Sequence, residues 1–256
     1  MQFEIIDFHT HPFISHKQNI CRHNEYMKIT PDNFKTYMKG LGISKICGSV
    51  ICSGDNSKEK MLENNNAAIE LKERYEDFYI PGFHINPLYK EESLKEIERM
   101  HKLGIKLVGE LVPYLDGWND YSLKEFDELL DLCEEYGMVV SFHSIGEDAM
   151  DKMVKKHKNL SLVAAHPGEY KEFMRHLERM KISENYFLDL SGTGLFRHGL
   201  LRHAIDVCGK ERIIFGTDFP VCNPSMYLGG VLMDSMVTDD EREYILSKNT
   251  KRLLGI

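Results

Sequence analysis

The sequence predicts a closed (β/α)₈ barrel (a TIM barrel), formed by one domain that spans residues 1–256. Short apolar runs alternate with helical patterns from end to end, and strands separated by helices form a parallel sheet. The length of 256 residues is close to that of one barrel. The alternative is an open doubly wound sheet, which carries a glycine-rich turn after its first strand. This chain has His-Thr-His-Pro at residues 9–12 instead, which favours the barrel.

Each predicted strand is a short apolar run, as is typical of strands that are buried on both faces. Polar or glycine-containing segments such as Asn86-Pro87 and residues 191–194 end these runs. The predicted strands cover residues 3–8, 45–52, 78–85, 105–111, 138–143, 160–166, 186–190 and 212–216.

The predicted helices begin at recognisable sequence signals. Thr30 is an N-cap, followed by a proline at the first helical position and an acidic first turn. Ser/Thr-x-x-Glu patterns at Ser93, Ser122 and Thr238 predict capping boxes for three later helices. The helices are expected at about 31–40, 58–75, 93–103, 122–136, 148–157, 170–180, 200–208 and 238–254.

Composition restricts the classes of function. The net charge of −8 argues against a nucleic-acid surface, which normally carries a basic patch. The six cysteines contain no C-x-x-C pair, so we expect no disulfide framework. The first predicted strand begins close to Met1, so we expect no signal peptide, and no apolar run is long enough to cross a bilayer. We therefore expect a cytoplasmic protein that acts on a small molecule, without a nucleic-acid or membrane partner.

Metal-binding residue types gather at the predicted strand ends. His9 and His11 follow the first strand, Glu110 lies in the fourth, and His143, His166 and Asp218 lie at the ends of the fifth, sixth and eighth. The carboxyl ends of all strands meet at one rim of a parallel barrel, where active sites form. Imidazole and carboxylate are ligands for zinc and similar divalent ions. The sequence therefore predicts a metal site at this rim.

These residues also carry a family resemblance. The chain resembles the amidohydrolase superfamily in several short segments. They are Asp7–His11, Phe142-His143, Ala165–Gly168 and Phe215–Pro220, with Asn249-x-x-Arg252-Leu253 near the end. The similarity is to its amidohydrolase-related branch, which includes aminocarboxymuconate semialdehyde decarboxylase. The resemblance implies that His9, His11, His143 and Asp218 hold one divalent ion. It also implies that His166 lies beside the ion as an acid, a base or a polarising group, and it is compatible with a homodimer.

Three imidazoles and a carboxylate suit Zn²⁺ and leave one position for water, although Mn, Co, Ni and Fe remain open. A bound ion would lower the pKa of water to roughly 7, and Asp218 could then take and deliver a proton. Glu110 has two interpretations. It is either a ligand that bridges to a second metal, as in the deoxyribonuclease branch of the superfamily, or a hydrogen-bond acceptor for a ligand histidine. One metal is the preferred prediction.

The predicted activity is hydrolysis of a small amide, cyclic amide, lactone or ester, with Asp218 and His166 as catalytic residues. Non-oxidative decarboxylation of a small aromatic or enoic carboxylic acid uses the same metal site and stays an alternative. The non-enzyme alternative is a metal-binding barrel without turnover. Candidate substrate contacts are Arg197 after the seventh strand, His84 in the third strand, and Arg22, whose guanidinium could bind a carboxylate.

Overall fold

The computed structural model describes residues 2–15, 18–21, 29–51 and 54–256. Eight parallel strands pair in sequence order, which confirms the predicted fold. The first and last strands also meet, because the Phe8 amide donates to the Phe215 carbonyl (3.0 Å) and Thr10 pairs with Phe219. The barrel is therefore closed. Its strands are β1 (Ile6–Asp7), β2 (Lys45–Ser49), β3 (Tyr79–Phe83), β4 (Leu107–Leu111), β5 (Val139–His143), β6 (Ser161–Ala165), β7 (Tyr186–Asp189) and β8 (Ile213–Ile214).

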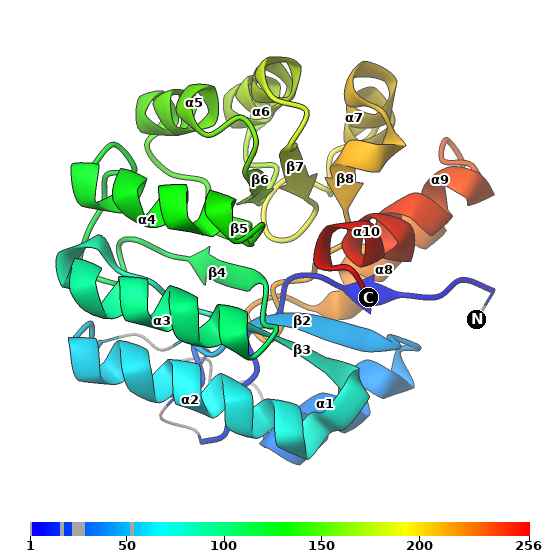
Figure 1. The fold of residues 1–256 in the computed structure, drawn as a ribbon. Coiled ribbons are helices and arrows are strands. Elements are labelled where there is room, and N and C mark those ends of the chain that lie inside the picture. The colour runs from blue at the N-terminus through cyan, green and yellow to red at the C-terminus, as the bar shows by residue number, and fades with distance from the viewer. Residues whose placement is uncertain (1, 16–17, 22–28, 52–53) are drawn as a thin grey trace.

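Helices surround the strands (Figure 1). No helix in the described part of the chain is long and apolar enough to span a membrane. Helix α8 was not predicted from the sequence, because its two glycines obscure a helical pattern. The helices are α1 (Pro31–Gly40), α2 (Lys58–Tyr75), α3 (Lys90–Lys102), α4 (Lys124–Glu135), α5 (Glu147–Lys156), α6 (Tyr170–Ile182), α7 (Leu200–Cys208), α8 (Pro224–Leu232), α9 (Asp239–Glu243) and α10 (Asn249–Leu254), and the π-helical turn η5 (Tyr244–Lys248) joins the last two.

Two of the four predicted helix caps are confirmed. The Thr30 hydroxyl accepts from the Asn33 amide (3.1 Å), and Thr238 forms a complete capping box. The other two are wrong. Ser93 lies inside α3, where its hydroxyl accepts from the amide of Asn86 (2.8 Å). Ser122 precedes α4 and donates to the Asp120 carboxylate, so local side-chain bonds replaced both caps.

Two apolar clusters fill the fold. The larger lies between the strands and the helices, and the smaller takes buried residues from seven of the eight strands and from α10. Its members, drawn from so many strands of a closed barrel, form the barrel interior. They are Ile6, Phe8, Cys47, Leu107, Val139, Val163, Phe187, Ile214 and Leu254, with Ile80 of β3 partly buried against them.

Gly48 in β2 allows the close approach of the chain that follows β1. Its φ is +141°, and a Cβ built there would lie 1.9 Å from the Thr10 carbonyl oxygen. We expect Gly48→Ala to lower the free energy of unfolding by about 3 kcal/mol or more, measured by urea denaturation. Gly40 at the end of α1 has no atom within 4 Å of its Cβ position, so Gly40→Ala is the control. The control should change stability by no more than about 1 kcal/mol, and an equal effect of both variants would contradict the prediction.

We expect the buried His176 to lower the free energy of unfolding as the pH falls. Burial first, and then the positive charge of Arg179, lower its pKa to about 3, whereas an unfolded histidine titrates near about 6.5. Between these values the unfolded chain binds a proton that the folded chain does not. This difference lowers the free energy of unfolding by about 1.4 kcal/mol for each pH unit of acidification.

We expect His176→Gln to remove this contribution, so that its unfolding free energy falls less than that of the wild type between about pH 6.5 and about pH 4.5. His203 lies exposed on α7, and His203→Gln should keep the wild-type slope. Urea denaturation at both pH values measures the difference. Equal slopes for the wild type and His176→Gln would show that His176 does not resist protonation.

Candidate metal centre

His9 and His11 lie just beyond β1, at the carboxyl-terminal rim of the barrel. Their Nε2 atoms are 3.2 Å apart, and each side chain is 2% exposed. The His11 amide donates to the Phe219 carbonyl, and the Asp218 amide donates to the His9 carbonyl, both at 2.8 Å. Closure of the barrel therefore brings Asp218 from the far end of the sequence to the two histidines.

The Asp218 carboxylate faces both imidazoles. Its Oδ1 lies 3.4 Å from Nε2 of His11 and 3.7 Å from Nε2 of His9. The backbone of Asp218 is left-handed, with a φ of 59°. Such a conformation persists only where the surrounding structure stabilises it. Oδ2 accepts a weak hydrogen bond from the Cys222 thiol at 3.7 Å. One oxygen of this carboxylate is therefore directed toward the histidines.

Glu110 lies at the middle of the cluster. Its Oε2 is 3.1 Å from Nε2 of His9 and 3.3 Å from Nε2 of His11. Its Oε1 is 2.9 Å from Nδ1 of His143 and 3.5 Å from Nε2 of His166. The carboxylate thus joins the rings at the end of β1 to those at the ends of β5 and β6.

An irregularity in β4 turns Glu110 inward. Leu107 belongs to the interior cluster, so strict alternation would direct residue 110 toward the helices. The register with β5 shifts between Val108 and Leu111, and both of these side chains pack in the outer cluster. Gly109 permits the shift, because its φ is +87° and a Cβ there would lie 2.2 Å from the Ser141 carbonyl oxygen.

The ligand atoms form two groups, and within each group they lie within 4.8 Å of one another. The first group is His9, His11 and Asp218, and the second is Glu110, His143 and His166. The structure therefore brings together all six residues that the sequence placed at strand ends. It groups His143 with Glu110 and His166, whereas the resemblance implied that His143 shares one ion with the first group.

The hydrogen bonds around the first group fit a divalent cation. The Nδ1 atoms of His9 and His11 face oxygen acceptors, Asp189 Oδ2 at 2.6 Å and the Ser49 carbonyl at 3.4 Å. Each ring then carries its hydrogen on Nδ1 and directs the lone pair of Nε2 toward the carboxylates. Two facing lone pairs beside two carboxylates form a donor set that suits Zn²⁺, Mn²⁺ and related ions.

Two further residues, Asp189 and Ser191, support this centre and were not predicted from the sequence. Asp189 ends β7 and is completely buried against His9. Ser191 lies between His9 and His166, and its amide donates to Asp189 (2.7 Å). The sequence contained a signal for Asp189, because it is a carboxylate at a strand end, as Glu110 and Asp218 are.

Electrostatics couple the members of the cluster. Burial opposes protonation of His9, but the negative charges of Asp189 and Glu110 outweigh it and hold the pKa of His9 well above its ordinary value. Burial likewise opposes ionisation of Glu110, but His9 and the other surrounding histidines hold its pKa well below its ordinary value. The buried carboxylates of this cluster therefore favour the binding of a cation.

The three predicted substrate contacts lie outside this cluster or outside the described residues. His84 is buried, with Nε2 at 2.9 Å from the Ser49 hydroxyl and Nδ1 at 3.7 Å from Asp116. Arg197 pairs with Glu169 and donates to the Gly168 carbonyl. Arg22 lies outside the described residues. Tyr114, by contrast, places its ring 5.3 Å from that of His143.

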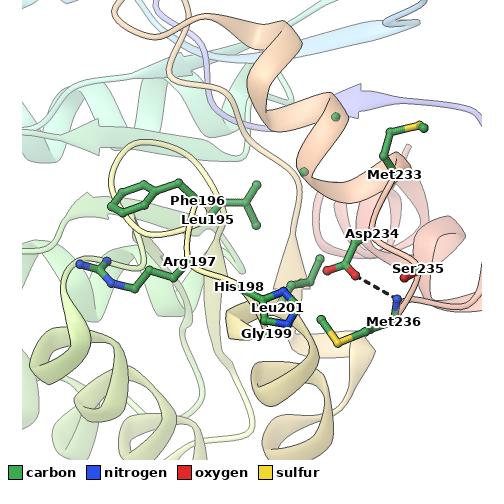
Figure 2. Close-up of a pocket in the computed structure, with 12 residues that line it drawn as sticks. Leu195, Phe196, Arg197, His198, Gly199, Leu201, Met233, Asp234, Ser235 and Met236 are labelled. Carbon is green, nitrogen blue, oxygen red and sulfur yellow. Dashed lines mark hydrogen bonds between the residues drawn. The ribbon is translucent and has the colours of Figure 1, made fainter.

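A separate cavity of about 420 Å³ lies between the loop that follows β7 and the segment that follows α8. Figure 2 shows His198 and Asp234 on its walls, while the side chain of Arg197 points away from Asp234. None of the six clustered residues lines this cavity.

Comparisons with known proteins agree with this description. A family model described as "Amidohydrolase" matches residues 6–256. No curated protein matches the sequence significantly.

Several solved structures share the fold. A 2,6-dihydroxybenzoate decarboxylase from Rhizobium is 15% identical, with 99% of each chain covered and a TM-score of 0.74. A probable 2-pyrone-4,6-dicarboxylic acid hydrolase from Acinetobacter baumannii is 16% identical, with 99% of this chain and 100% of that chain covered and a TM-score of 0.69. A dihydroxybenzoic acid decarboxylase from Polaromonas with bound manganese is 14% identical, with 99% and 97% covered and a TM-score of 0.70.

Proposed function

Since the chain belongs to the amidohydrolase family, we propose that it is a metal-dependent hydrolase of a small amide, cyclic amide, lactone or ester. The observation that carries the proposal is the Asp218 carboxylate, whose Oδ1 lies within 3.7 Å of Nε2 of both His9 and His11. Two imidazole lone pairs and a carboxylate at one point provide both a cation site and a group that can exchange a proton there.

His9, His11 and Asp218 would hold the ion, with Glu110 and His143 beside them. A bound divalent ion would supply Lewis acidity, which polarises a carbonyl group and lowers the pKa of water to roughly 7. Asp218 would take the proton of the attacking water and deliver it to the leaving nitrogen or oxygen. His166 would stabilise the negative charge that develops on the carbonyl oxygen of the substrate.

Decarboxylation of a small carboxylic acid is the second candidate, and the solved structures favour it. Two of the similar structures are decarboxylases of dihydroxybenzoic acids, and one of these was solved with manganese and 2-nitroresorcinol. In this reaction a C–H bond replaces the bond to the carboxylate, carbon dioxide leaves, and Asp218 or His166 supplies the proton. Manganese is therefore a candidate ion together with zinc.

Metal removal tests the proposal. We expect the purified protein to contain about one equivalent of a divalent metal per chain, measured by elemental analysis. Dialysis against a chelator should abolish turnover and lower the melting temperature, and added Zn²⁺ or Mn²⁺ should restore both, because an ion that binds the folded state stabilises it. Less than about 0.1 equivalent, with no uptake of added zinc, would favour a barrel without metal catalysis.

A substrate screen separates the two reactions. The metal-loaded protein would be tested against lactones, amides and aromatic carboxylic acids. Hydrolysis consumes water and releases an acid from an ester or lactone, whereas decarboxylation releases carbon dioxide and consumes a proton. Chromatography of the products together with carbon dioxide detection therefore distinguishes the two candidates for any substrate that turns over.

A further inference from the structure

The Ser191 hydroxyl lies between two rings of the metal centre. Ser191 follows β7 and is completely buried. Its Oγ is 3.0 Å from Nδ1 of His9 and 3.1 Å from Nδ1 of His166. Within the described parts of the chain, these two nitrogens are the side-chain hydrogen-bond partners of this hydroxyl. A single hydroxyl hydrogen must therefore be assigned to one of two imidazoles.

The carboxylate of Asp189 is a stronger acceptor than Ser191 and fixes the ring hydrogen of His9 on Nδ1. Nδ1 of His9 lies 2.6 Å from Oδ2 of Asp189, and an ionised carboxylate only accepts hydrogen bonds. The Ser191 amide holds the other oxygen of that carboxylate at 2.7 Å. His9 therefore keeps its hydrogen on Nδ1 and directs it to Asp189. Ser191 cannot donate to a nitrogen that already carries a hydrogen.

The hydroxyl hydrogen of Ser191 then has one acceptor, Nδ1 of His166. If His166 carried its own hydrogen on Nδ1, the Ser191 hydrogen would have no acceptor among the described side chains. Such a loss is unfavourable in a buried site. The favoured arrangement leaves the ring hydrogen of His166 on Nε2, which lies 3.5 Å from Oε1 of Glu110.

We propose that Ser191 is a positioning residue that keeps the hydrogen of His166 on Nε2. His166 then faces the centre as a hydrogen-bond donor and not as a metal ligand. The second group of candidate ligands then loses one of its three members, and Glu110 accepts a hydrogen bond from His166. This inference rests on the proposed function for its catalytic meaning, but the position of the hydrogen can be measured without turnover.

The test is ¹⁵N NMR of histidine-labelled, zinc-loaded protein, in which protonated and unprotonated ring nitrogens give distinct signals. His166→Gln identifies the signals of His166. We expect Nε2 of His166 to be protonated and Nδ1 unprotonated in the wild type and in Ser191→Thr, which keeps a hydroxyl. Ser191→Ala should shift the ratio of the two tautomers toward Nδ1–H by about fivefold, the effect of one neutral hydrogen bond. We expect the zinc-loaded wild-type sample to contain about one equivalent of bound zinc.

Ser49→Ala is the matched control. Ser49 is equally buried, and its hydroxyl contacts the His84 ring at 2.9 Å, so the change removes a similar bond outside the six-residue cluster. It should leave the His166 signals unchanged. Circular dichroism confirms that each variant is folded.

Two results would overturn the inference: Nδ1–H on His166 in the wild type, or identical His166 signals in Ser191→Ala and the wild type. A wild type that binds no zinc would overturn the proposed function instead. In that case the same signals, recorded on metal-free protein at alkaline pH where the ring is neutral, still decide the role of Ser191.

Discussion

Asp218→Asn is expected to lower kcat by about 10³-fold on any substrate that the screen identifies, because an amide cannot exchange the proton that the reaction requires. The variant should keep its fold and much of its metal. Its side-chain oxygen still faces His9 and His11, and its hydrogen bonds from the backbone of the turn are unchanged. Steady-state kinetics with elemental analysis of the same sample measures both quantities.

The control for this substitution is Asp234→Asn. Asp234 lies in the separate cavity and accepts from the Met236 amide (2.9 Å), a bond that an asparagine oxygen also accepts. It should retain wild-type kcat and metal content. Full activity in Asp218→Asn would remove Asp218 from the proton transfer. Loss of metal in parallel with activity would instead indicate that Asp218 serves mainly as a ligand.

His9→Ala is expected to weaken metal binding more than any other single substitution. Its Nε2 is within 3.7 Å of His11, Glu110 and Asp218, so alanine removes one of the two imidazole nitrogens that face the carboxylates. Removal of an outer hydrogen-bond partner of a ligand typically costs about 10- to 100-fold in affinity, and the loss of the ligand itself should exceed that range. Competition against a chelator of known affinity measures the change.

Asp189→Asn provides a graded comparison at the same ring. Asparagine can donate its amide hydrogen to Nδ1 of His9, which transfers the ring hydrogen to Nε2 and blocks the lone pair that faces the centre. We expect an affinity loss of about 10- to 100-fold, smaller than that of His9→Ala. Unchanged metal affinity in both variants would exclude His9 as a ligand.

Much of this architecture was predictable from local sequence signals. The barrel was predicted correctly from eight apolar runs and the helices between them, because strands buried on both faces have a distinctive composition. The predicted family resemblance is also confirmed, since the family model matches residues 6–256. The Thr30 and Thr238 caps were predicted correctly because capping depends on neighbouring residues alone.

The errors share a physical cause, competition from contacts that the capping or helical pattern does not itself include. Ser93 and Ser122 carry a capping pattern, but bonds to Asn86 and Asp120 take their hydroxyls. Helix α8 was missed because two glycines obscure its periodic pattern, whereas in the fold its buried Tyr227, Leu228 and Val231 pack in the larger apolar cluster.

For the candidate metal centre, the residue types at the strand ends can be read from the sequence alone, because the alternation of strands and helices brings all those ends to one rim. How these residues group depends on the three-dimensional fold. The register shift in β4 turns Glu110 inward, barrel closure brings Asp218 to His9, and Asp189 with Ser191 assigns the ring hydrogens. Each of these depends on pairing between segments distant in the chain, and such pairing leaves no mark in the pattern of neighbouring residues.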